Sequence, residues 1–377
     1  MIPAAVRSVL VIPDKFKGSL TADQAARAIA AGLRERKHAF RITLLPLSDG
    51  GEGFVEILAR AEGGQLHFRR TVDPLGRPRR AAFAALPDGT AVIGLTEASG
   101  LAHVPAARRD PGAASTLGTG RLLAAAVRAG FRRIVIGLGG SATNDGGIGL
   151  AAPLGFRFLD ARGRSIPLNG EGLARLERIV PPPRLPKLDI VVACDVGHPL
   201  YGPEGAAHQF AAQKGATPEQ IVRLDANLRR LAAVVRRDLG KSPHLRAGAG
   251  AAGGCGYGLM AFFGARRVAG FDYFARAVSL QKRIAEHDLI VTGEGCFDRT
   301  SLGGKGPWAV GTLARRAGKE AWLVCGKYAL DERESAGSPF SRTVELLTIA
   351  PSPEAARREA ARYVREGVAE LARQGAT

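Results

Sequence analysis

The residues best suited to chemistry lie in one glycine-rich stretch, residues 137–147, which reads GLGGSATNDGG. Its paired glycines allow backbone N–H groups to approach a ligand closely. Ser141, Thr143 and Asn144 can add hydrogen bonds, and Asp145 can bind a metal ion or a hydroxyl group. The alternative interpretation is a long connection between a strand and a helix. A plain turn needs few such residues, so the stretch favours a binding loop.

Carboxylates also lie beside glycine in other predicted loops, and one ends a predicted strand. These side chains are Asp49, Glu52, Glu294 and Asp298, with Asp195 at the strand end. Such oxygen ligands suit Mg²⁺, which takes one or two protein carboxylates together with phosphate oxygens. Any single carboxylate of this kind could instead be a helix cap or a turn residue. Their recurrence in several loops is what indicates a functional site.

Lysine occupies comparable positions, although arginine is the more frequent basic residue. Lys15 and Lys17 follow a predicted strand, and Lys305 lies in a glycine-rich segment. Glycine N–H groups, lysine charge and metal-binding carboxylates are what phosphoryl transfer needs, because that reaction depends on positioning and electrostatic stabilisation. The sequence therefore predicts a phosphoryl-transfer enzyme whose positive charge attracts anionic substrates.

Two nucleotide-binding signatures give different results. The P-loop pattern G-x-x-x-x-G-K-[ST] is not present, because Gly306 follows Lys305. Residues 137–142 fit the loose dinucleotide pattern G-x-G-x-x-[GA], with Asp160 downstream as a ribose partner. The residues directly after this pattern are polar and glycine-rich, where an apolar helix face is expected. An NAD-dependent Rossmann oxidoreductase acting on a small hydroxy acid is kept as the alternative function.

The elements that must position these loops follow a repeated order of strand, polar glycine loop and helix. Residues 8–13 form an apolar run, and Thr21 is placed to cap a helix over residues 22–36. Residues 41–47 and 288–291 are further predicted strands, each followed by glycine and a carboxylate. This order predicts an open α/β sheet with ligand groups beyond the carboxyl ends of its strands.

The middle of the chain has a different pattern, because residues 67–72 and 80–86 alternate like antiparallel strands. We therefore predict an α/β protein of two domains. A flavodoxin/Rossmann-like parallel-sheet domain combines residues 1–65 with 285–377. A second, mixed α/β domain, residues 66–284, is inserted in it.

Composition narrows the class of protein. At 377 residues the chain is long enough for two cores. Its net charge of +18 comes from arginines spread over many predicted helix faces, and only 6% of residues are aromatic. We therefore predict no specific nucleic-acid binding. Four scattered cysteines argue against a zinc site or a disulfide framework and are compatible with a reducing cytoplasm.

Two segments bear on location. The first apolar run is short and ends at Asp14, which is unlike a signal peptide. Residues 247–265 carry no charge, but seven of the nineteen are glycine, which leaves too few large apolar side chains for a membrane span. We predict a glycine loop leading into a buried helix there, and a cytoplasmic protein that does not enter a membrane.

The motifs together resemble the glycerate kinase family, bacterial type I and glycerate 2-kinase-like, over nearly the whole chain. Nine ordered motifs carry the resemblance: DKFKGSLTA (14–22), PLSDGGEG (46–53), DPLGRP (73–78), STLGTG (115–120), GLGGSATNDGG (137–147), CDV-x-x-PL-x-G (194–202), QKGA (213–216), GAGAAGG-x-GYGLMAF (248–262) and TGEG-x-x-D (292–298). The chain departs from the family pattern at Arg121, His198, residues 209–212 and residues 300–301. These departures leave the carboxylates intact, so they concern the fine-tuning of the substrate site and not the reaction class.

The resemblance implies a two-domain kinase that uses ATP and Mg²⁺ to phosphorylate D-glycerate. The 2-hydroxyl is the implied acceptor, giving 2-phosphoglycerate, and the 3-hydroxyl is left open. Asp195 is the implied base for that hydroxyl, a role that needs a carboxylate within hydrogen-bond reach. The implied partners are D-glycerate and ATP, and a homodimer is also left open.

The predicted site residues fall into three groups. The catalytic group is Asp195, Lys15 and Lys17. The group that binds substrate or phosphate is Gly18, Ser19, Asp49, Gly50, Gly51, Gly139, Gly140, Ser141, Thr143, Asn144, Gly293, Thr300, Ser301 and Lys305. The metal group is Glu52, Asp145, Glu294 and Asp298.

Overall fold

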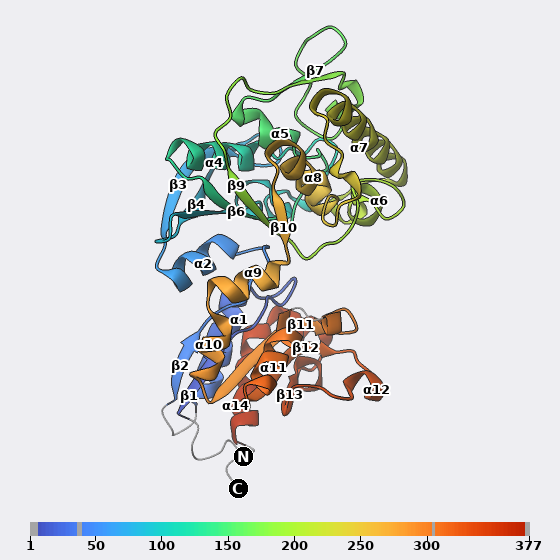
Figure 1. Cartoon of the computed structure of the whole chain (residues 1–377). Helices are drawn as coiled ribbons and strands as arrows, with labels where there is room; N and C mark the ends of the chain where they lie inside the picture. Colours follow the sequence, from blue (N-terminus) through green and yellow to red (C-terminus); the bar gives the residue numbers. More distant parts are fainter. Residues whose placement is uncertain (1–6, 36–39, 304–305, 374–377) are drawn as a thin grey trace. The chain divides into compact units, whose positions relative to one another are not determined.

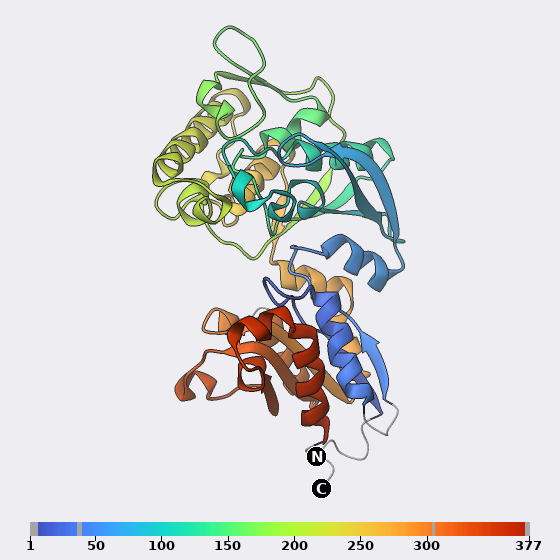
Figure 2. The same cartoon turned by 180° about the vertical axis from the view of Figure 1, so that it is seen from behind.

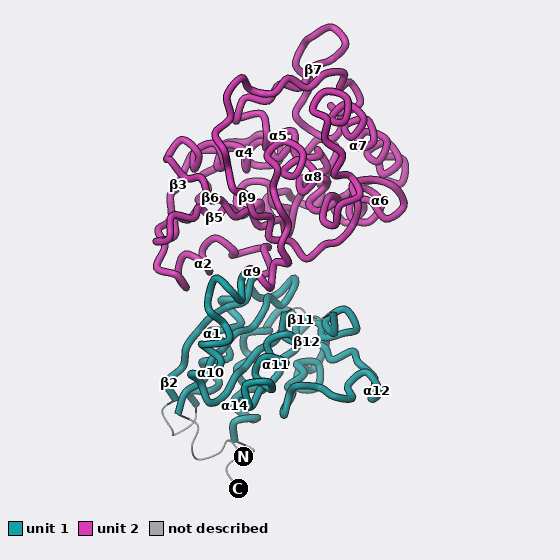
Figure 3. The backbone as a smooth tube through the Cα atoms, in the orientation of Figure 1, with its two compact units in different colours: residues 1–48, 274–377 teal, residues 49–273 magenta. Residues whose placement is uncertain are grey.

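The computed structural model describes residues 7–35, 40–303 and 306–373. The chain divides into two compact units, coloured separately in Figure 3. Unit 1 combines the two ends of the chain, and unit 2 is the continuous middle segment between them. Their bounds are residues 1–48 with 274–377 for unit 1, and residues 49–273 for unit 2.

The described residues of unit 1 form a five-stranded parallel sheet in the spatial order β13-β12-β11-β1-β2. Counted along the chain, this is the 2-1-3-4-5 order of flavodoxin-like folds, so the predicted parallel sheet is confirmed. The strands are β1 (Ser8–Val11), β2 (Arg41–Leu44), β11 (Leu289–Phe297), β12 (Glu320–Tyr328) and β13 (Arg342–Glu345).

Helices cover both faces of this sheet. α1 (Ala22–Arg34) and α14 (Ala360–Arg373) lie side by side on one face (Figure 2), and α11 (Gly306–Arg316) lies on the other (Figure 1). The alternation of side chains along β12 explains the two layers. Trp322 is buried in the core that α1 and α14 complete, and its neighbour Leu323 is buried in the core that α11 completes.

In the part of the chain that the structure describes, unit 2 has a six-stranded mixed sheet in the order β10-β9-β6-β5-β4-β3. β3, β4 and β5 pair antiparallel, as the alternating pattern predicted, and β5, β6, β9 and β10 pair parallel. The strands are β3 (Gln65–Val72), β4 (Pro78–Ala85), β5 (Thr90–Gly94), β6 (Arg133–Gly137), β9 (Asp189–Ala193) and β10 (Arg266–Val268).

α2 (Phe54–Glu62) covers one face of this second sheet, and α4 (Leu117–Arg128) and α8 (Ala251–Phe263) cover the other (Figure 1). Ile134 and Ile136 of β6 are buried in the core that α4 and α8 complete. The buried helix predicted within residues 247–265 is therefore confirmed as α8. None of the described helices is both long and apolar enough to span a bilayer.

The remaining elements are shorter or lie outside the two main sheets. They are α3 (Thr96–Ser99), α5 (Ile148–Ala151), α6 (Ala206–Phe210), α7 (Pro218–Leu239), α9 (Gly270–Ala277), α10 (Leu280–Ala285), α12 (Glu332–Ser335), α13 (Pro353–Arg358), and the antiparallel pair β7 (Arg157–Leu159) and β8 (Arg178–Val180).

The unit boundaries differ from the domain boundaries predicted near residues 65 and 285. α2 accounts for the first difference, because this helix packs against β4 and β5 and so belongs to unit 2. α10 accounts for the second, because it packs against α11 of unit 1. A mixed domain inserted in a discontinuous parallel-sheet domain is consistent with this division.

Several predicted elements have different bounds in the structure, and the largest difference is in β11. The strand expected over residues 288–291 continues to Phe297, because Glu294 and its neighbours pair with β12. The prediction of a loop at Glu294 was therefore wrong. Near the end of the described chain, Glu359 separates α13 from α14.

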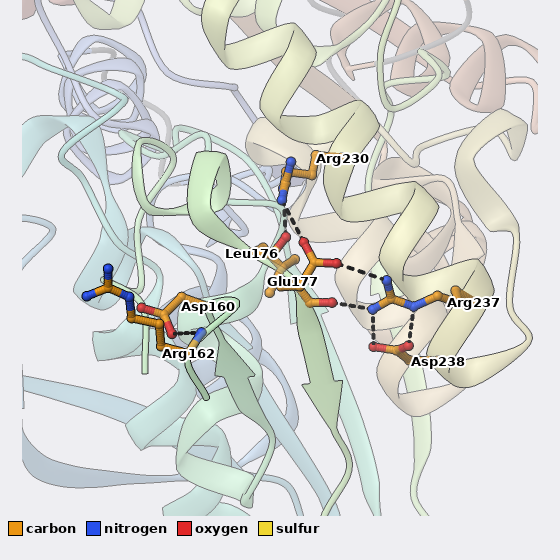
Figure 4. A network of polar contacts seen from close by, with 7 residues as sticks. All are labelled: Asp160, Arg162, Leu176, Glu177, Arg230, Arg237 and Asp238. Carbon is orange, nitrogen blue, oxygen red and sulfur yellow. Dashed lines mark hydrogen bonds and ion pairs between the residues drawn. The ribbon is translucent and has the colours of Figure 1, made fainter. Parts of the chain in front are cut away.

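Arginine pairs hold α7 to β8 on the surface of unit 2 (Figure 4). Glu177, directly before β8, lies 2.9 Å from Arg230 and 3.4 Å from Arg237 of α7. Arg237 also pairs with its neighbour Asp238 at 2.7 Å. Exposed pairs of this kind contribute roughly 0.2–1 kcal/mol each and are screened by salt. Part of the arginine surplus thus serves local pairing on helix surfaces.

Candidate active site

In unit 1, predicted site residues gather at the carboxyl ends of β1 and β11, where the strand order of the sheet reverses. Ligands bind at such switch points in open α/β sheets. The Asp14 N–H donates to the Gly293 oxygen at 2.7 Å, which brings loop 14–20 against β11. A Cβ at Gly295 would lie 3.0 Å from the Lys17 nitrogen, so glycine there allows the close approach of the two segments.

Glu294 is the most perturbed carboxylate of this group. Its Oε1 is buried and has no hydrogen-bond partner among the described residues. Burial raises the pKa of Glu294 to about 7, against a hydrogen bond from Ser301, and the charges of Asp14 and Asp298 add to the rise. Ionised Glu294 would therefore be stabilised by a cation. Asp14 was not among the predicted site residues, although it lies between the apolar run 8–13 and the predicted Lys15.

Asp298 and the residues after it form a compact turn. Thr300 donates to Asp298 Oδ1 from its N–H at 2.8 Å and from its hydroxyl at 2.6 Å, and these bonds lower the pKa of Asp298. The Asp298 N–H donates to the Ser301 hydroxyl at 3.2 Å. The predicted metal role of Asp298 stays a prediction, because Oδ1 already serves the turn. Lys305 lies outside the described residues.

Loop 14–20 holds four of the predicted residues. Lys15 Nζ lies 3.5 Å from Asp14 Oδ1, so the lysine charge is next to the carboxylate group. Lys17 and Gly18 are exposed, and Gly18 adopts φ +80°, a backbone conformation that favours glycine. The Ser19 hydroxyl donates to a carbonyl within the turn at 3.2 Å. The loop therefore presents one lysine near carboxylates and a second toward solvent.

In unit 2, loop 49–53 lies against the carboxyl ends of β6 and β9. The Gly139 N–H donates to the Gly50 oxygen at 2.9 Å. A Cβ at Gly50 would lie 2.6 Å from the Ala193 oxygen, and one at Gly139 would lie 2.4 Å from the Gly51 Cα. Either Cβ would collide with backbone, so glycine at these positions is what allows the loops to meet.

Asp195 follows β9 and is half-buried at the same edge of the sheet. Its Oδ1 accepts the Gly270 N–H at 2.9 Å. The same glycine packs on Asp49, because a Cβ at Gly270 would lie 1.8 Å from the Asp49 carbonyl oxygen. The structure therefore brings Asp49 and Asp195 together around Gly270. Glu52, in the same loop as Asp49, is exposed.

The glycine-rich stretch has an exposed end and a buried end. Gly140 is exposed, Ser141 is 7% exposed, and Thr143, Asn144 and Asp145 are fully buried. The Thr143 hydroxyl oxygen and both polar side-chain atoms of Asn144 have no hydrogen-bond partner among the described residues. Direct ligand contacts by Thr143 and Asn144 stay predictions, because in this arrangement protein atoms enclose both side chains.

Asp145 anchors the buried end of this stretch to the start of α4. Its Oδ2 accepts the Thr116 N–H at 2.8 Å and the Thr116 hydroxyl at 2.7 Å, and its Oδ1 accepts the Gly147 N–H at 3.0 Å. Burial raises the pKa of Asp145, although these hydrogen bonds oppose the rise. The geometry favours a structural role for Asp145, and its metal role stays a prediction.

Lys214 is a second residue that sequence reasoning did not assign to the site. It is 3% exposed, and its Nζ donates to the Ser141 hydroxyl and to the Thr143 carbonyl, both at 2.8 Å. Burial lowers the pKa of Lys214 to about 8, and the nearby Asp145 charge opposes that change. The available signal was the QKGA motif, which supported the resemblance but was given no chemical role.

The predicted metal ligands are carboxylates, and they are distributed over both units. Among the described residues, no three or more His, Cys, Asp or Glu side chains are grouped to hold a metal ion. Mg²⁺ requires only one or two carboxylates, because phosphate oxygens and water complete its coordination. Glu294 fits this requirement best, since its buried Oε1 lacks a hydrogen-bond partner among the described residues.

Known proteins resemble the chain over most of its length. The family model described as "Glycerate kinase family" matches residues 9–375. "Glycerate kinase" from Bacillus subtilis is 41% identical over 311 residues, which is 81% of either chain. "Glycerate 2-kinase" from Escherichia coli is 40% identical over 327 residues, which is 86% of either chain.

A solved structure agrees with these sequence matches. The crystal structure of a candidate glycerate kinase 2 from Salmonella typhimurium LT2 has a TM-score of 0.79 and 38% identity, and the match covers 98% of both chains. The alternative of an NAD-dependent oxidoreductase finds no support in these matches. The loose dinucleotide pattern also lacks its helix, because the next helix, α5, begins only at Ile148.

Proposed function

The chain belongs to the glycerate kinase family, and on that premise we propose that it transfers the γ-phosphoryl group of ATP to the 2-hydroxyl of D-glycerate, giving 2-phosphoglycerate. Family membership makes the protein an ATP-dependent phosphotransferase. The choice of the 2-hydroxyl is supported by the name of the Escherichia coli relative. It depends on fine placement of the substrate, so 3-phosphoglycerate is the competing product.

The observation that carries the proposal is the position of Asp195 at the end of β9. In phosphoryl transfer, the acceptor hydroxyl must lose its proton to a base that is already oriented toward it. The Gly270 N–H holds Asp195 Oδ1 at 2.9 Å and so fixes the direction of the carboxylate. Asp195 is half-buried beside Asp49 and the glycine loops. We assign Asp195 the role of base.

Mg²⁺ is the second part of the proposal, and Glu294 is the residue that would hold it. The buried Oε1 of Glu294 and the nearby charges of Asp14 and Asp298 suit a divalent cation. Such a cation neutralises charge on the phosphate oxygens of the nucleotide during transfer. Lys15, which lies next to Asp14, would add a second positive charge for those oxygens.

The test is direct. Purified protein is mixed with ATP, MgCl₂ and D-glycerate, ADP formation is followed, and the product isomer is identified by ³¹P NMR. We expect ADP to form only with D-glycerate present and the product to be 2-phosphoglycerate. No ADP formation with D-glycerate would refute the proposal, and 3-phosphoglycerate would refute the regiochemistry alone.

Two further proposals, on the cellular compartment and on the oligomeric state, rest on the sequence. We propose a cytoplasmic enzyme, because the cysteines are compatible with a reducing compartment. A homodimer is the assembly that the sequence left open, and light scattering on the purified protein measures it. A molar mass close to the 39.5 kDa of one chain would exclude the dimer.

A further inference from the structure

Lys214 is a buried ammonium group directly behind the exposed end of the glycine-rich stretch. It lies in the short turn before Gly215, 73 residues along the chain from Ser141. Its Nζ lies 2.8 Å from the Ser141 hydroxyl oxygen and 2.8 Å from the Thr143 carbonyl oxygen. The charge therefore sits beneath the part of the loop where Gly140 reaches the surface.

We propose that Lys214 is a positioning residue that holds the Ser141 hydroxyl as a hydrogen-bond donor to an anionic oxygen of a substrate. That oxygen belongs either to the carboxylate of the hydroxy acid or to a phosphoryl group of the nucleotide. This inference rests on the proposed function and adds to it Lys214, with the role of orienting Ser141.

The proposal is supported mainly by the direction of the hydrogen bond between Lys214 and Ser141. An ammonium group has donors only, so the Ser141 oxygen must accept. The single proton of the hydroxyl is then directed away from Lys214 and is available to a ligand. A serine without such a neighbour can rotate between donating and accepting. Lys214 thus fixes Ser141 in the form that an anion requires.

The burial of Lys214 makes its charge effective at the loop. A charge that is 3% exposed is screened by solvent far less than a surface lysine. Asp145, whose charge acts on Lys214, accepts hydrogen bonds from Thr116 and Gly147. With a pKa lowered by burial to about 8, Lys214 is still mainly protonated at neutral pH. The loop therefore lies over a positive charge that favours anion binding.

The neighbouring side chains indicate that this loop does more than connect two elements. The Thr143 hydroxyl oxygen and the Asn144 side-chain amide are fully buried without partners in the described part of the chain. Buried polar atoms without partners destabilise a fold, and native proteins keep few of them. The presence of these unpartnered atoms beside Lys214 favours a ligand-binding role for the loop. A purely structural role of Lys214 gives no reason for them.

The test uses Lys214→Met, Ser141→Ala and the double variant, with Lys241→Met as the control. Lys241 is an exposed lysine of the same unit. Calorimetry measures the affinity for D-glycerate and for ATP separately, and steady-state kinetics give KM and kcat. We expect each single variant to weaken binding of the same ligand by roughly tenfold to a hundredfold, as for a lost hydrogen bond to a charged group. The double variant should be no weaker than the single ones, because both remove one interaction.

The outcomes separate the two anions and the two hypotheses. A loss confined to D-glycerate assigns Ser141 to the carboxylate, and a loss confined to ATP assigns it to a phosphoryl group. Equal loss of both ligands in Lys214→Met with no loss in Ser141→Ala would make Lys214 a structural clamp and overturn the proposal. Additive losses in the double variant would overturn it too.

Two further results keep the test decisive. If Lys214→Met does not fold, Ser141→Ala decides alone, because the proposal requires a ligand-selective loss in that variant and unchanged affinities refute it. Wild-type protein that phosphorylates no hydroxy acid would refute the proposed function instead. An active wild type with variants of unchanged affinity would refute only the role of Lys214.

Discussion

The two units each place predicted site residues at the carboxyl ends of parallel strands, but the buried group beside those residues differs: it is a carboxylate in unit 1 and a lysine in unit 2. In unit 1 the carboxylates of Asp14, Glu294 and Asp298 gather, and the pKa of Glu294 rises to about 7 as burial and this negative charge oppose its ionisation. In unit 2 a glycine loop lies over the buried ammonium of Lys214. The first region suits a cation, and the second suits an anion.

The same fold rule produces both regions, because helices and loops alternate around parallel strands in each unit. The difference comes from what lies behind the loops. In unit 1 Glu294 lies within β11, and Asp14 and Asp298 lie in the segments that follow β1 and β11. In unit 2 the charge comes from a distant turn that packs beneath the loop. Substitutions in each unit test this difference.

The largest expected effect is that of Asp195→Asn in unit 2. The variant keeps the size of the side chain but removes the base, so kcat should fall by about 10²- to 10⁴-fold, the range for general-base catalysis. Asp189→Asn is the matched control, because Asp189 is exposed at the other end of β9. Steady-state kinetics with D-glycerate measure both. An Asp195→Asn variant with wild-type kcat would remove Asp195 from the mechanism.

A large effect on stability is expected at alkaline pH from Lys214. Its pKa in the folded protein is about 8, against 10.5 for an ordinary lysine. Between these values the unfolded chain holds a proton that the folded one has lost, so the free energy of unfolding rises with pH, by up to about 3 kcal/mol. Lys214→Met should lack this rise, and Lys241→Met should keep it.

Urea unfolding of the three proteins from pH 7.5 to 10.5 measures this difference, over a range set by the two pKa values. A free energy of unfolding that falls as the pH increases would contradict the lowered pKa of Lys214. A protein loses stability with increasing pH when the pKa of a lysine rises on folding. If the free energy of unfolding changed with pH in the same way in Lys214→Met and in the wild type, that result would also contradict the lowered pKa of Lys214.

A smaller effect is expected from Glu294→Gln in unit 1. If Glu294 holds Mg²⁺, the variant should need roughly tenfold to a hundredfold more Mg²⁺ for half-maximal activity, the range seen when a carboxylate that supports a metal site is lost. Glu332→Gln is the control, since Glu332 is exposed in α12 of the same unit. Titration of activity with MgCl₂ measures both. The same Mg²⁺ requirement in both variants would exclude Glu294 from the metal site.

Much of the fold could be predicted from the sequence, because short-range patterns determine it. The β-branched run 134–136 lies in β6, and the Thr21 hydroxyl accepts the Gln24 N–H in a capping box at the predicted start of α1. The glycines beside Glu294 predict a loop there. The pairing of Glu294 with β12, a tertiary interaction, outweighed that preference.

The buried half of the candidate site could not be predicted in this way. The position of Asp145 beside glycine predicts an exposed ligand. In the structure Asp145 is buried, and its Oδ2 accepts the hydroxyl of Thr116, 29 residues earlier. Lys214 reaches Ser141 across 73 residues. A sequence shows that such side chains exist, whereas burial and partners follow from long-range packing. The loops that carry glycine and carboxylate together were therefore easier to predict than the charges behind them.

The smallest expected effect lies away from both regions, in the arginine pairs of Figure 4. Glu177 contacts Arg230 and Arg237, but its side chain is 46% exposed, so water already competes for it. Glu177→Gln should therefore lower the free energy of unfolding by only about 0.2–1 kcal/mol and leave activity unchanged. Urea unfolding at low and high salt measures it, and salt should shrink the difference. A loss above about 2 kcal/mol that persists in high salt would mean that surface arginines stabilise unit 2 more than exposed pairs do, and the contrast with the buried Lys214 would then weaken.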